Sequence, residues 1–346
     1  MSYIMKQLIA VLLLFFVFSF CGITQRKHGN FLVNDKYKAK VILLDTGYKC
    51  SLRGLSVLND SVFYTSGSNG TVVKSTDGGK TLEWLKVKGF EKTDFRDIEV
   101  IDEHTAIIMG ITLPAVMLKT VDGGKNWRTV FKDTAANMFL DAMSFYDNNK
   151  GIALGDPINN QFYLATTSDG GDTWQPLSID KRPTALQGEA CFASSGSNII
   201  LQKSGRFLFV TGGLKARLWN GNNWQSLAIT QGQESTGANS ISMNLQNKTL
   251  AIVGGDFTQK NKRDSSLLLI NKMLDFTIPL QCNGYRSSVC FYNSNTIFSC
   301  GLNGVDMNNE LISTIGFHAI QKAKNGTTVY MVGGNGKIGK LQLNKQ

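Results

Sequence analysis

The chain has 346 residues, and its content of 42% apolar and 18% charged residues excludes an intrinsically disordered protein. Glycine is abundant, with 35 residues, and proline is rare, with 5, which suits many tight turns between short strands. The formal net charge is +10, but lysine and arginine are spread along the chain and accompany no RNA- or DNA-binding motif. We therefore expect no nucleic-acid partner.

Residues 1–24 are expected to form a secretory signal peptide. Lys6 precedes an apolar run at 8–20, which is too short to span a bilayer and fits the hydrophobic region of a signal sequence. Cys21 stands where a bacterial lipoprotein would carry its lipid, although the residue before it is bulky. The sequence leaves two alternatives open for Cys21: removal with the signal peptide, or lipidation. With 25–36 as a linker, the mature protein is expected in the periplasm, on the envelope or outside a bacterial cell, and a lipid anchor would be its sole contact with a membrane.

Three short segments repeat the pattern Ser/Thr-x-Asp-Gly-Gly, and a tryptophan follows close behind: STDGGKTLEW at 75–84, TVDGGKNW at 120–127 and TSDGGDTW at 167–174. Their aspartates are 45 and 47 residues apart. A period of roughly 40–50 residues is that of a four-stranded propeller blade. The segments therefore indicate a repeat architecture.

The repeated segments are expected to be structural turns. The glycine pair allows positive φ in a tight turn, the aspartate can accept hydrogen bonds from backbone N–H groups, and the tryptophan packs on the neighbouring sheet. Three acids in three separate turns cannot converge on one substrate. The residues assigned this role are Asp77, Gly79, Asp122, Gly124, Trp127, Asp169, Gly171 and Trp174, and in the first segment Leu82 takes the tryptophan position with Trp84 two residues later.

An apolar strand that ends in glycine recurs seven times, at Gly67, Gly110, Gly155, Gly212, Gly254, Gly301 and Gly333. Each unit can be divided into four short strands, so residues 37–346 are predicted to form one all-β domain, a seven-bladed β-propeller. The last unit supplies about three strands. Residues 37–44 are expected to complete it by pairing with the strand near Lys340–Leu343, which closes the ring. The period argues against the alternative of a β-sandwich, and the lack of capping segments argues against a solenoid.

Polar and charged residues recur where the innermost strand of each blade is expected to begin. Such a ring at one mouth of the channel could hold a ligand or a partner loop, or it could be a set of ion pairs that satisfy one another. We expect no catalytic residue among them. The candidate binding residues are Arg53, Arg96, Asp97, Asp141, Glu189, Arg286 and His318, with Ser240 at the corresponding place in the fifth blade.

The sequence predicts no cofactor and no metal site. No Gly-x-Gly-x-x-Gly segment follows a strand and opens a helix, and the three histidines are scattered among three regions. Five cysteines follow Cys21, without zinc spacing or a Cys-x-x-Cys pair. The sequence leaves open whether Cys282, Cys290 and Cys300 include a disulfide or are buried free thiols.

The repeated segments resemble the Asp-box, or BNR, repeats of sialidases, sortilin-type receptors and photosystem II assembly-factor propellers. More specific segments occur in the order found in bacterial photosystem II stability/assembly-factor-like proteins, from about residue 50 to the C-terminus: LRGLSVLNDSVFYTSGSNGTV, FRDIEV, DAMSFYDNNKGIALGDP, GEACFASSGSNI, TGGLKARL, GGDF, GYRSSV, FHAI and GGNGKIGKL. Similar sequences often carry the loose labels oxidoreductase or BNR glycosyl hydrolase. The resemblance implies a seven-bladed propeller that acts as an assembly or stability scaffold.

An enzymatic alternative is sialidase-like hydrolysis. It needs an arginine cluster for a carboxylate, a tyrosine nucleophile with a glutamate, and an acid, and Arg53, Arg96, Arg286, Glu189 and Tyr285 offer most of these residue types. The segment FRDI at 95–98 lacks the proline of the sialidase motif, and sialidases have six blades. We therefore predict an exported, monomeric, non-catalytic propeller that binds another envelope or secreted protein, or a glycan, with a sialidase-like or carbohydrate-binding propeller as the alternative.

Overall fold

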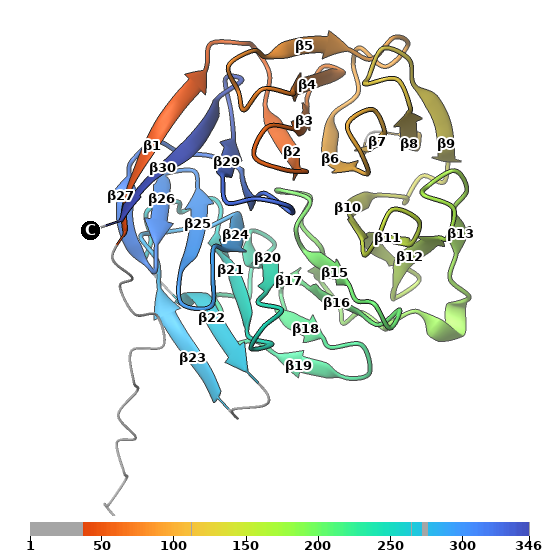
Figure 1. Ribbon diagram of the computed structural model, residues 1–346. Coiled ribbons are helices and arrows are strands. Elements are labelled where there is room, and N and C mark those ends of the chain that lie inside the picture. The colour runs from red at the N-terminus through yellow and green to blue at the C-terminus, as the bar shows by residue number, and fades with distance from the viewer. Residues whose placement is uncertain (1–36, 112, 264, 272–275, 346) are drawn as a thin grey trace, which may run out of the picture. The chain divides into compact units, whose positions relative to one another are not determined.

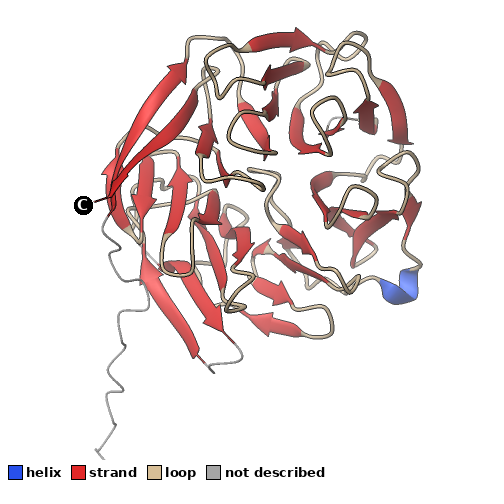
Figure 2. Ribbon diagram, viewed as in Figure 1, coloured by secondary structure: helices blue, strands red, loops and turns tan. Residues whose placement is uncertain are grey.

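The computed structural model describes residues 37–345 except 112, 264 and 272–275. The predicted signal peptide, Cys21 and the linker lie outside the described residues. Seven antiparallel sheets follow one another around a ring (Figure 1). Apart from the single-turn 3-10 helix η1 (Ile179–Lys181), the described elements are strands (Figure 2). The predicted all-β, seven-bladed propeller is confirmed.

The first three blades each contain four strands joined by short turns. Blade 1 consists of β2 (Leu52–Val57), β3 (Phe63–Gly67), β4 (Thr71–Ser75) and β5 (Glu83–Lys86). Blade 2 consists of β6 (Phe95–Val100), β7 (Ala106–Gly110), β8 (Ala115–Thr120) and β9 (Arg128–Asp133). Blade 3 consists of β10 (Leu140–Phe145), β11 (Gly151–Ile158), β12 (Gln161–Thr167) and β13 (Gln175–Pro176).

The next three blades follow the same order with one elaboration. Blade 4 consists of β15 (Ile199–Leu201), β16 (Phe207–Val210), β18 (Arg217–Trp219) and β19 (Trp224–Ser226). Blade 5 consists of β20 (Thr236–Met243), β21 (Leu250–Asp256), β22 (Ser265–Asn271) and β23 (Phe276–Gln281), and its sheet is extended by β14 (Glu189–Ala190) and β17 (Gly212–Gly213). Blade 6 consists of β24 (Ser288–Phe291), β25 (Ile297–Gly301), β26 (Gly304–Met307) and β27 (Glu310–Ser313).

Blade 7 combines both ends of the described chain. Its strands are β28 (Ala319–Lys322), β29 (Val329–Val332), β30 (Ile338–Lys345) and β1 (Tyr37–Asp45). β1 pairs antiparallel with β30, with Ile42 opposite Lys340 and Ala39 opposite Leu343. The predicted closing strand is therefore confirmed, and it covers an edge of β30 that would otherwise be open.

Alternating apolar residues explain how the blades hold together. The inner strands are almost fully buried, as in β3 and β7, while outer strands such as β5 and β9 are half exposed. Six clusters of buried hydrophobic residues each join two consecutive blades; in one, Met117 of blade 2 packs with Met143 and Ala153 of blade 3. Burial between blades, rather than within one blade, therefore stabilises the ring.

The region between blades 3 and 4 differs from the simple repeat. Glu189, which was expected to begin the innermost strand of a blade, lies in β14, whose partner β17 extends the sheet of blade 5. The innermost strand of blade 4 is β15, ten residues after Glu189. The physical reason is the long interval between Gly155 and Gly212, which leaves room for η1 and for an extended segment before β15.

Two general properties of the described residues bear on function. None of their helices is long and apolar enough to cross a membrane. Their five cysteines are free thiols, four of them buried.

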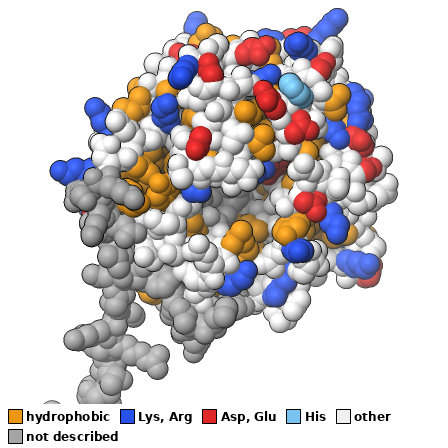
Figure 3. All heavy atoms as spheres, in the orientation of Figure 1, with side chains coloured by type: hydrophobic (Ala, Val, Ile, Leu, Met, Phe, Trp, Pro, Cys, Tyr) orange, Lys and Arg blue, Asp and Glu red, His pale blue; other side chains and the backbone are white. Residues whose placement is uncertain are grey.

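On the face shown in Figure 3, acidic and basic side chains are interspersed among apolar ones.

Candidate binding site at the channel mouth

The segment at 190–198, which precedes β15, runs through the middle of the ring, where its green trace is visible in Figure 1. It contacts blades on opposite sides. The carbonyl oxygen of Ala193 accepts from Arg96 Nη1 of blade 2 at 3.4 Å, and Ser195 Oγ donates to the carbonyl oxygen of Ser287, beside blade 6, at 2.8 Å. Ser197 Oγ lies 2.8 Å from Ser240 Oγ of blade 5. The channel is therefore filled by the chain's own backbone at this level.

A pocket of about 420 Å³ lies on one side of this segment. Residues of six different blades or their connections line it, so it is the mouth of the channel. We call it the mouth pocket, and its lining residues are Arg53, Arg96, Phe139, Asp156, Ala190, Cys191, Phe192, Ala193, Ser194, Phe257, Tyr285, Ser287, Leu302 and His318. The structure thus brings together three of the candidate binding residues, Arg53, Arg96 and His318.

Arg53 is the unusual charge in this pocket. It is half-buried at the start of β2, and within the described part of the chain no hydrogen bond or ion pair involves its guanidinium. Burial, followed by the nearby Arg96, lowers the pKa of Arg53 from its usual value. Arg96, in contrast, forms an ion pair with Asp94 at 2.9 Å. Arg53 therefore faces the pocket without an ion-pair partner among the described residues, although the carboxylate of Asp94 acts on it from nearby.

His318 contributes a neutral group beside Arg53. Its Nδ1 lies 3.1 Å from the carbonyl oxygen of Leu52, so this nitrogen carries the proton and Nε2 is left as an acceptor. Burial, together with the nearby Arg53, lowers the pKa of His318 to about 3. The imidazole is therefore uncharged at neutral pH, and the positive charge of the pocket belongs to the arginines.

Aromatic side chains form another wall of the mouth pocket. Phe257 makes edge contacts with Phe192, at a centroid distance of 6.0 Å, and with Tyr285, at 6.4 Å. Phe139 and Leu302 also line the pocket. Tyr285 donates its hydroxyl hydrogen bond to Asn239 Oδ1 at 2.9 Å, so its ring is held in place. The wall is apolar and rigid, which suits the body of a ligand rather than a hydrated ion.

Asp156 supplies the acidic group of the mouth pocket. It lies in β11, and its Oδ1 accepts a hydrogen bond from the backbone N–H of Cys191 at 2.9 Å. Burial raises the pKa of Asp156 to about 6. Among the described residues no ion pair or hydrogen bond joins Asp156 to Arg53.

The other candidate residues are placed elsewhere. Arg286 is fully buried and pairs with Asp306, with its Nε 2.9 Å from Oδ2. Glu189 pairs with Arg217 and accepts from Thr211 Oγ1 at 2.5 Å. These two residues form internal ion pairs and do not line the mouth pocket.

The two remaining acids are buried in the ring. Asp97 accepts from the backbone N–H groups of Met143, at 2.5 Å, and Ile98, at 2.8 Å, and lines a separate inner cavity of about 220 Å³ beyond the crossing segment. Asp141 is fully buried, and neither of its carboxylate oxygens has a hydrogen-bond partner. Burial raises the pKa of both acids.

The three repeated turns share one hydrogen-bond pattern. In each, the hydroxyl of the first residue donates to the aspartate and accepts from the second glycine of the pair; in the second turn these bonds join Thr120 Oγ1 to Asp122 Oδ1 at 2.8 Å and to Gly124 N at 3.0 Å. The glycines have φ between +71° and +90°. Backbone and side-chain hydrogen bonds lower the pKa of Asp122 to about 2, so the aspartate acts as an ionised acceptor within its own turn.

The hydroxyl residue of each turn was not assigned a role from the sequence, although its Ser/Thr position was part of the pattern. Ser75, Thr120 and Thr167 are all buried and each joins the aspartate to the glycine pair. The recurrence of a hydroxyl two positions before each aspartate was the signal that could have identified them.

Of the residues named for a sialidase, Arg53, Arg96 and Tyr285 line the mouth pocket, whereas Glu189 and Arg286 form ion pairs outside it. Tyr285 bonds to Asn239 and Glu189 bonds to Arg217, so no tyrosine–glutamate pair forms between them. Burial raises the pKa of Tyr285 to about 12, which disfavours the phenolate that a nucleophile requires.

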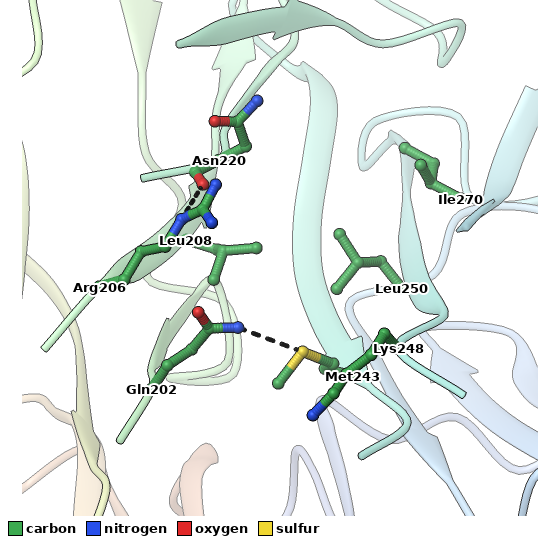
Figure 4. Close-up of a pocket in the computed structure, with 8 residues that line it drawn as sticks. All are labelled: Gln202, Arg206, Leu208, Asn220, Met243, Lys248, Leu250 and Ile270. Atoms are coloured by element: carbon green, nitrogen blue, oxygen red, sulfur yellow. Dashed lines mark hydrogen bonds between the residues drawn. The ribbon is translucent and has the colours of Figure 1, made fainter. Parts of the chain in front are cut away.

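A third cavity, of about 250 Å³, lies between blades 4 and 5 (Figure 4). Gln202 Nε2 points to Met243 Sδ at 3.5 Å, and Arg206 Nε donates to the carbonyl oxygen of Asn220 at 2.7 Å. The cavity also includes Ile270, which is close in sequence to residues 272–275, and these lie outside the described residues. We therefore assign it no ligand.

No protein-family model and no curated protein sequence matches the chain. Many solved structures are similar to it, and two of YCF48 are among them. One is described as YCF48 bound to a D1 peptide, with a TM-score of 0.60, 14% sequence identity, and coverage of 88% of this chain and 94% of that one. The other is YCF48 from Cyanidioschyzon merolae, with a TM-score of 0.60, 15% identity, and coverage of 87% and 98%. At this identity the likeness shows that the chain has the fold of the photosystem II assembly-factor propeller YCF48.

Proposed function

We propose that this chain is a protein-binding propeller that holds a segment of a partner polypeptide at the channel mouth. The observation that carries this proposal is the mouth pocket itself, in which an unpaired Arg53 stands beside an aromatic wall. The structural neighbour bound to a D1 peptide supports a peptide-binding role for the fold. The partner need not be photosynthetic, because shared fold alone does not transfer a function.

The surface around the pocket supports a polypeptide partner. Leu214 follows β17, and Phe257 and Leu302 directly follow the second strands of blades 5 and 6; these three residues are 40%, 41% and 39% exposed. Phe257 and Leu302 also line the mouth pocket, so apolar surface continues from the pocket onto its rim. Apolar residues that remain exposed beside a pocket are typical of a protein interaction site.

The location of the partner follows from the N-terminal sequence. Residues 1–24 predict export, and so we place the partner in the bacterial envelope or among secreted proteins. In this proposal the protein acts without catalysis, as a scaffold that assembles or stabilises its partner.

Site-specific crosslinking tests the proposal. A photoreactive residue at Leu302, on the rim, is expected to crosslink one discrete envelope protein in cells, whereas the same residue at Leu311, 45% exposed on β27 and outside the mouth pocket, is not. Ala190→Trp, which fills the pocket, should abolish the crosslink at Leu302 without changing the circular dichroism spectrum. Crosslinks from both positions, or a crosslink that survives Ala190→Trp, would contradict binding at the mouth.

A further inference from the structure

We propose that the mouth pocket recognises a single carboxylate carried on an apolar or aromatic group, with Arg53 as the residue that binds the carboxylate. The inference rests on the proposed function, because it names the chemistry by which the mouth pocket would hold its partner. It depends on three observations: the state of Arg53, the charges around it and the wall beside it.

Arg53 has the properties of a ligand-binding arginine rather than a structural one. Two other arginines of the described chain, the buried Arg286 and the half-buried Arg217, form ion pairs with Asp306 and Glu189. Arg53 is half-buried in a pocket, and the described residues supply no acceptor for its five N–H groups. Its guanidinium nitrogens are not among the fully buried atoms, so they are open to the pocket, where a bound carboxylate would satisfy two N–H groups at once.

The surrounding charges favour an anion with one negative charge. Arg96 is paired with Asp94 and His318 is neutral, so among the basic groups of the lining Arg53 is the charged one without an ion-pair partner. Asp156, which also lines the pocket, opposes a second negative charge. A monoanionic carboxylate therefore fits better than a dianionic phosphate.

The rest of the lining determines what carries the carboxylate. Phe192, Phe257 and Tyr285 form a contiguous aromatic wall in the same pocket as Arg53. Its volume of about 420 Å³ falls within the range of small-ligand pockets and exceeds the needs of a carboxylate alone. The extra space is apolar, so the group attached to the carboxylate should be apolar or aromatic.

Binding of small probes tests this assignment. N-acetyl-phenylalanine carries the proposed carboxylate and ring, N-acetyl-phenylalaninamide lacks the charge, and phenyl phosphate carries a second charge. We expect wild-type protein to bind the acid about tenfold more tightly than the amide, and more tightly than the phosphate, in ligand-observed nuclear magnetic resonance titrations. Equal affinity for acid and amide would overturn the proposal.

Matched variants distinguish recognition of the carboxylate by Arg53 from a general electrostatic attraction between the protein and an anion. Arg53→Gln should remove the preference for the acid over the amide, while Lys215→Gln, which removes an exposed cation in the turn before β18 and outside the pocket lining, should leave it unchanged. Phe257→Ala should weaken acid and amide alike. Equal losses for Arg53→Gln and Lys215→Gln would show unspecific electrostatics and contradict the assignment. Melting curves establish that each variant is folded.

The carboxylate could belong to a polypeptide or to a free small molecule, and a second arm distinguishes them. A decapeptide ending in phenylalanine, its C-terminal amide, and an amidated decapeptide with an internal glutamate beside phenylalanine are compared with N-acetyl-phenylalanine. Tighter binding of either acidic peptide assigns the carboxylate to a polypeptide, at its end or within it. Equal binding of the small acid assigns it to a free molecule.

Failure of this inference is distinguishable from failure of the proposed function. If the Leu302 crosslink is lost in Ala190→Trp but kept in Arg53→Gln, and no acid binds, the mouth binds a protein without recognising a carboxylate. If the acid binds through Arg53 and no protein is crosslinked, carboxylate recognition stands and the protein partner is wrong.

Discussion

Thr120 illustrates how one hydroxyl organises a repeated turn. It is buried, donates to Asp122 and accepts from the backbone N–H of Gly124. The aspartate then accepts from the backbone N–H of Asn126 at 2.9 Å. The acid and the hydroxyl therefore satisfy the polar backbone of a turn in which two glycines have positive φ.

Replacement of this hydroxyl should destabilise the protein. Thr120→Val keeps the shape but leaves the Gly124 N–H without its acceptor, which costs about 1–3 kcal/mol. Thr120→Ser retains the hydroxyl and is the matched control. Calorimetry should show a clearly lower melting temperature for the valine variant than for the serine variant, and equal melting temperatures would contradict the structural role of the turn.

Asp156 should make the stability of the protein depend on pH. Its pKa in the folded state is about 6, above the value of a free aspartate, so the folded protein holds this proton more tightly than the unfolded chain. The resulting contribution to the free energy of unfolding is fully present below about pH 4 and is lost as the pH rises through 6. In Asp156→Asn the side chain does not ionise, so this loss of stability with rising pH disappears. The amide oxygen can still accept the hydrogen bond from the Cys191 N–H. We expect the variant to be more stable than wild type by about 1–3 kcal/mol at pH 7.5 and to have no advantage at pH 4. Melting curves across this range test the prediction, and a constant difference would contradict it.

At the scale of elements, β1 closes the ring from the far end of the chain. It pairs with β30 along nearly its whole length, and Ala39 and Val41 pack against the cluster shared by blades 6 and 7. Without it, the outer edge of β30 would expose unpaired backbone groups and apolar surface.

Truncation measures this closure. A protein that begins at residue 46 should melt at least several degrees below one that begins at residue 37, and it should aggregate more readily, because the edge of β30 is open. A synthetic peptide of residues 37–45 added in excess should raise the melting temperature of the truncated protein in a concentration-dependent way. Identical melting of the two proteins would show that β1 adds nothing to the stability of the ring.

At the scale of the whole molecule, the segment at 190–198 joins opposite sides of the ring. It separates the mouth pocket from the inner cavity and gives Arg96 a backbone acceptor at Ala193. A Cβ added at Gly196, where φ is +65°, would lie 2.1 Å from Asp97 Oδ1. The segment therefore passes Asp97 so closely that only glycine fits.

Gly196→Ala should therefore lower the stability of the protein by more than backbone strain alone would lower it. Gly205→Ala is the control, because Gly205 also has positive φ, +82°, but no atom lies within 4 Å of its added Cβ. The control should lose about 1 kcal/mol and Gly196→Ala about 2–4 kcal/mol, since a clash with a buried carboxylate is added. Unfolding in urea checks both values, and equal losses would mean that the segment does not pack tightly against Asp97.

The sequence by itself determined the architecture of this protein. Seven apolar strands ending in glycine, with a period near 45 residues, predicted the number of blades, and the short last unit predicted that residues 37–44 would complete it. These features depend on the alternation of apolar and polar residues along each strand and on the residue types of the turns, and both are properties of residues that are close in sequence. The pairing of Ile42 with Lys340 follows from closure of the ring.

The tertiary structure decided which polar residues face the mouth. Arg53 and Arg286 occupy similar places before or within an inner strand, yet Arg286 is buried against Asp306 and Arg53 faces a pocket without a partner. The insertion before β15 places Glu189 in β14, away from the mouth pocket, and it places Phe192 and Ala193 in the lining of that pocket. The neighbours of a charge come from distant parts of the chain, and their distances determine whether it forms an ion pair or remains free for a ligand, so spacing in the sequence could not distinguish the two.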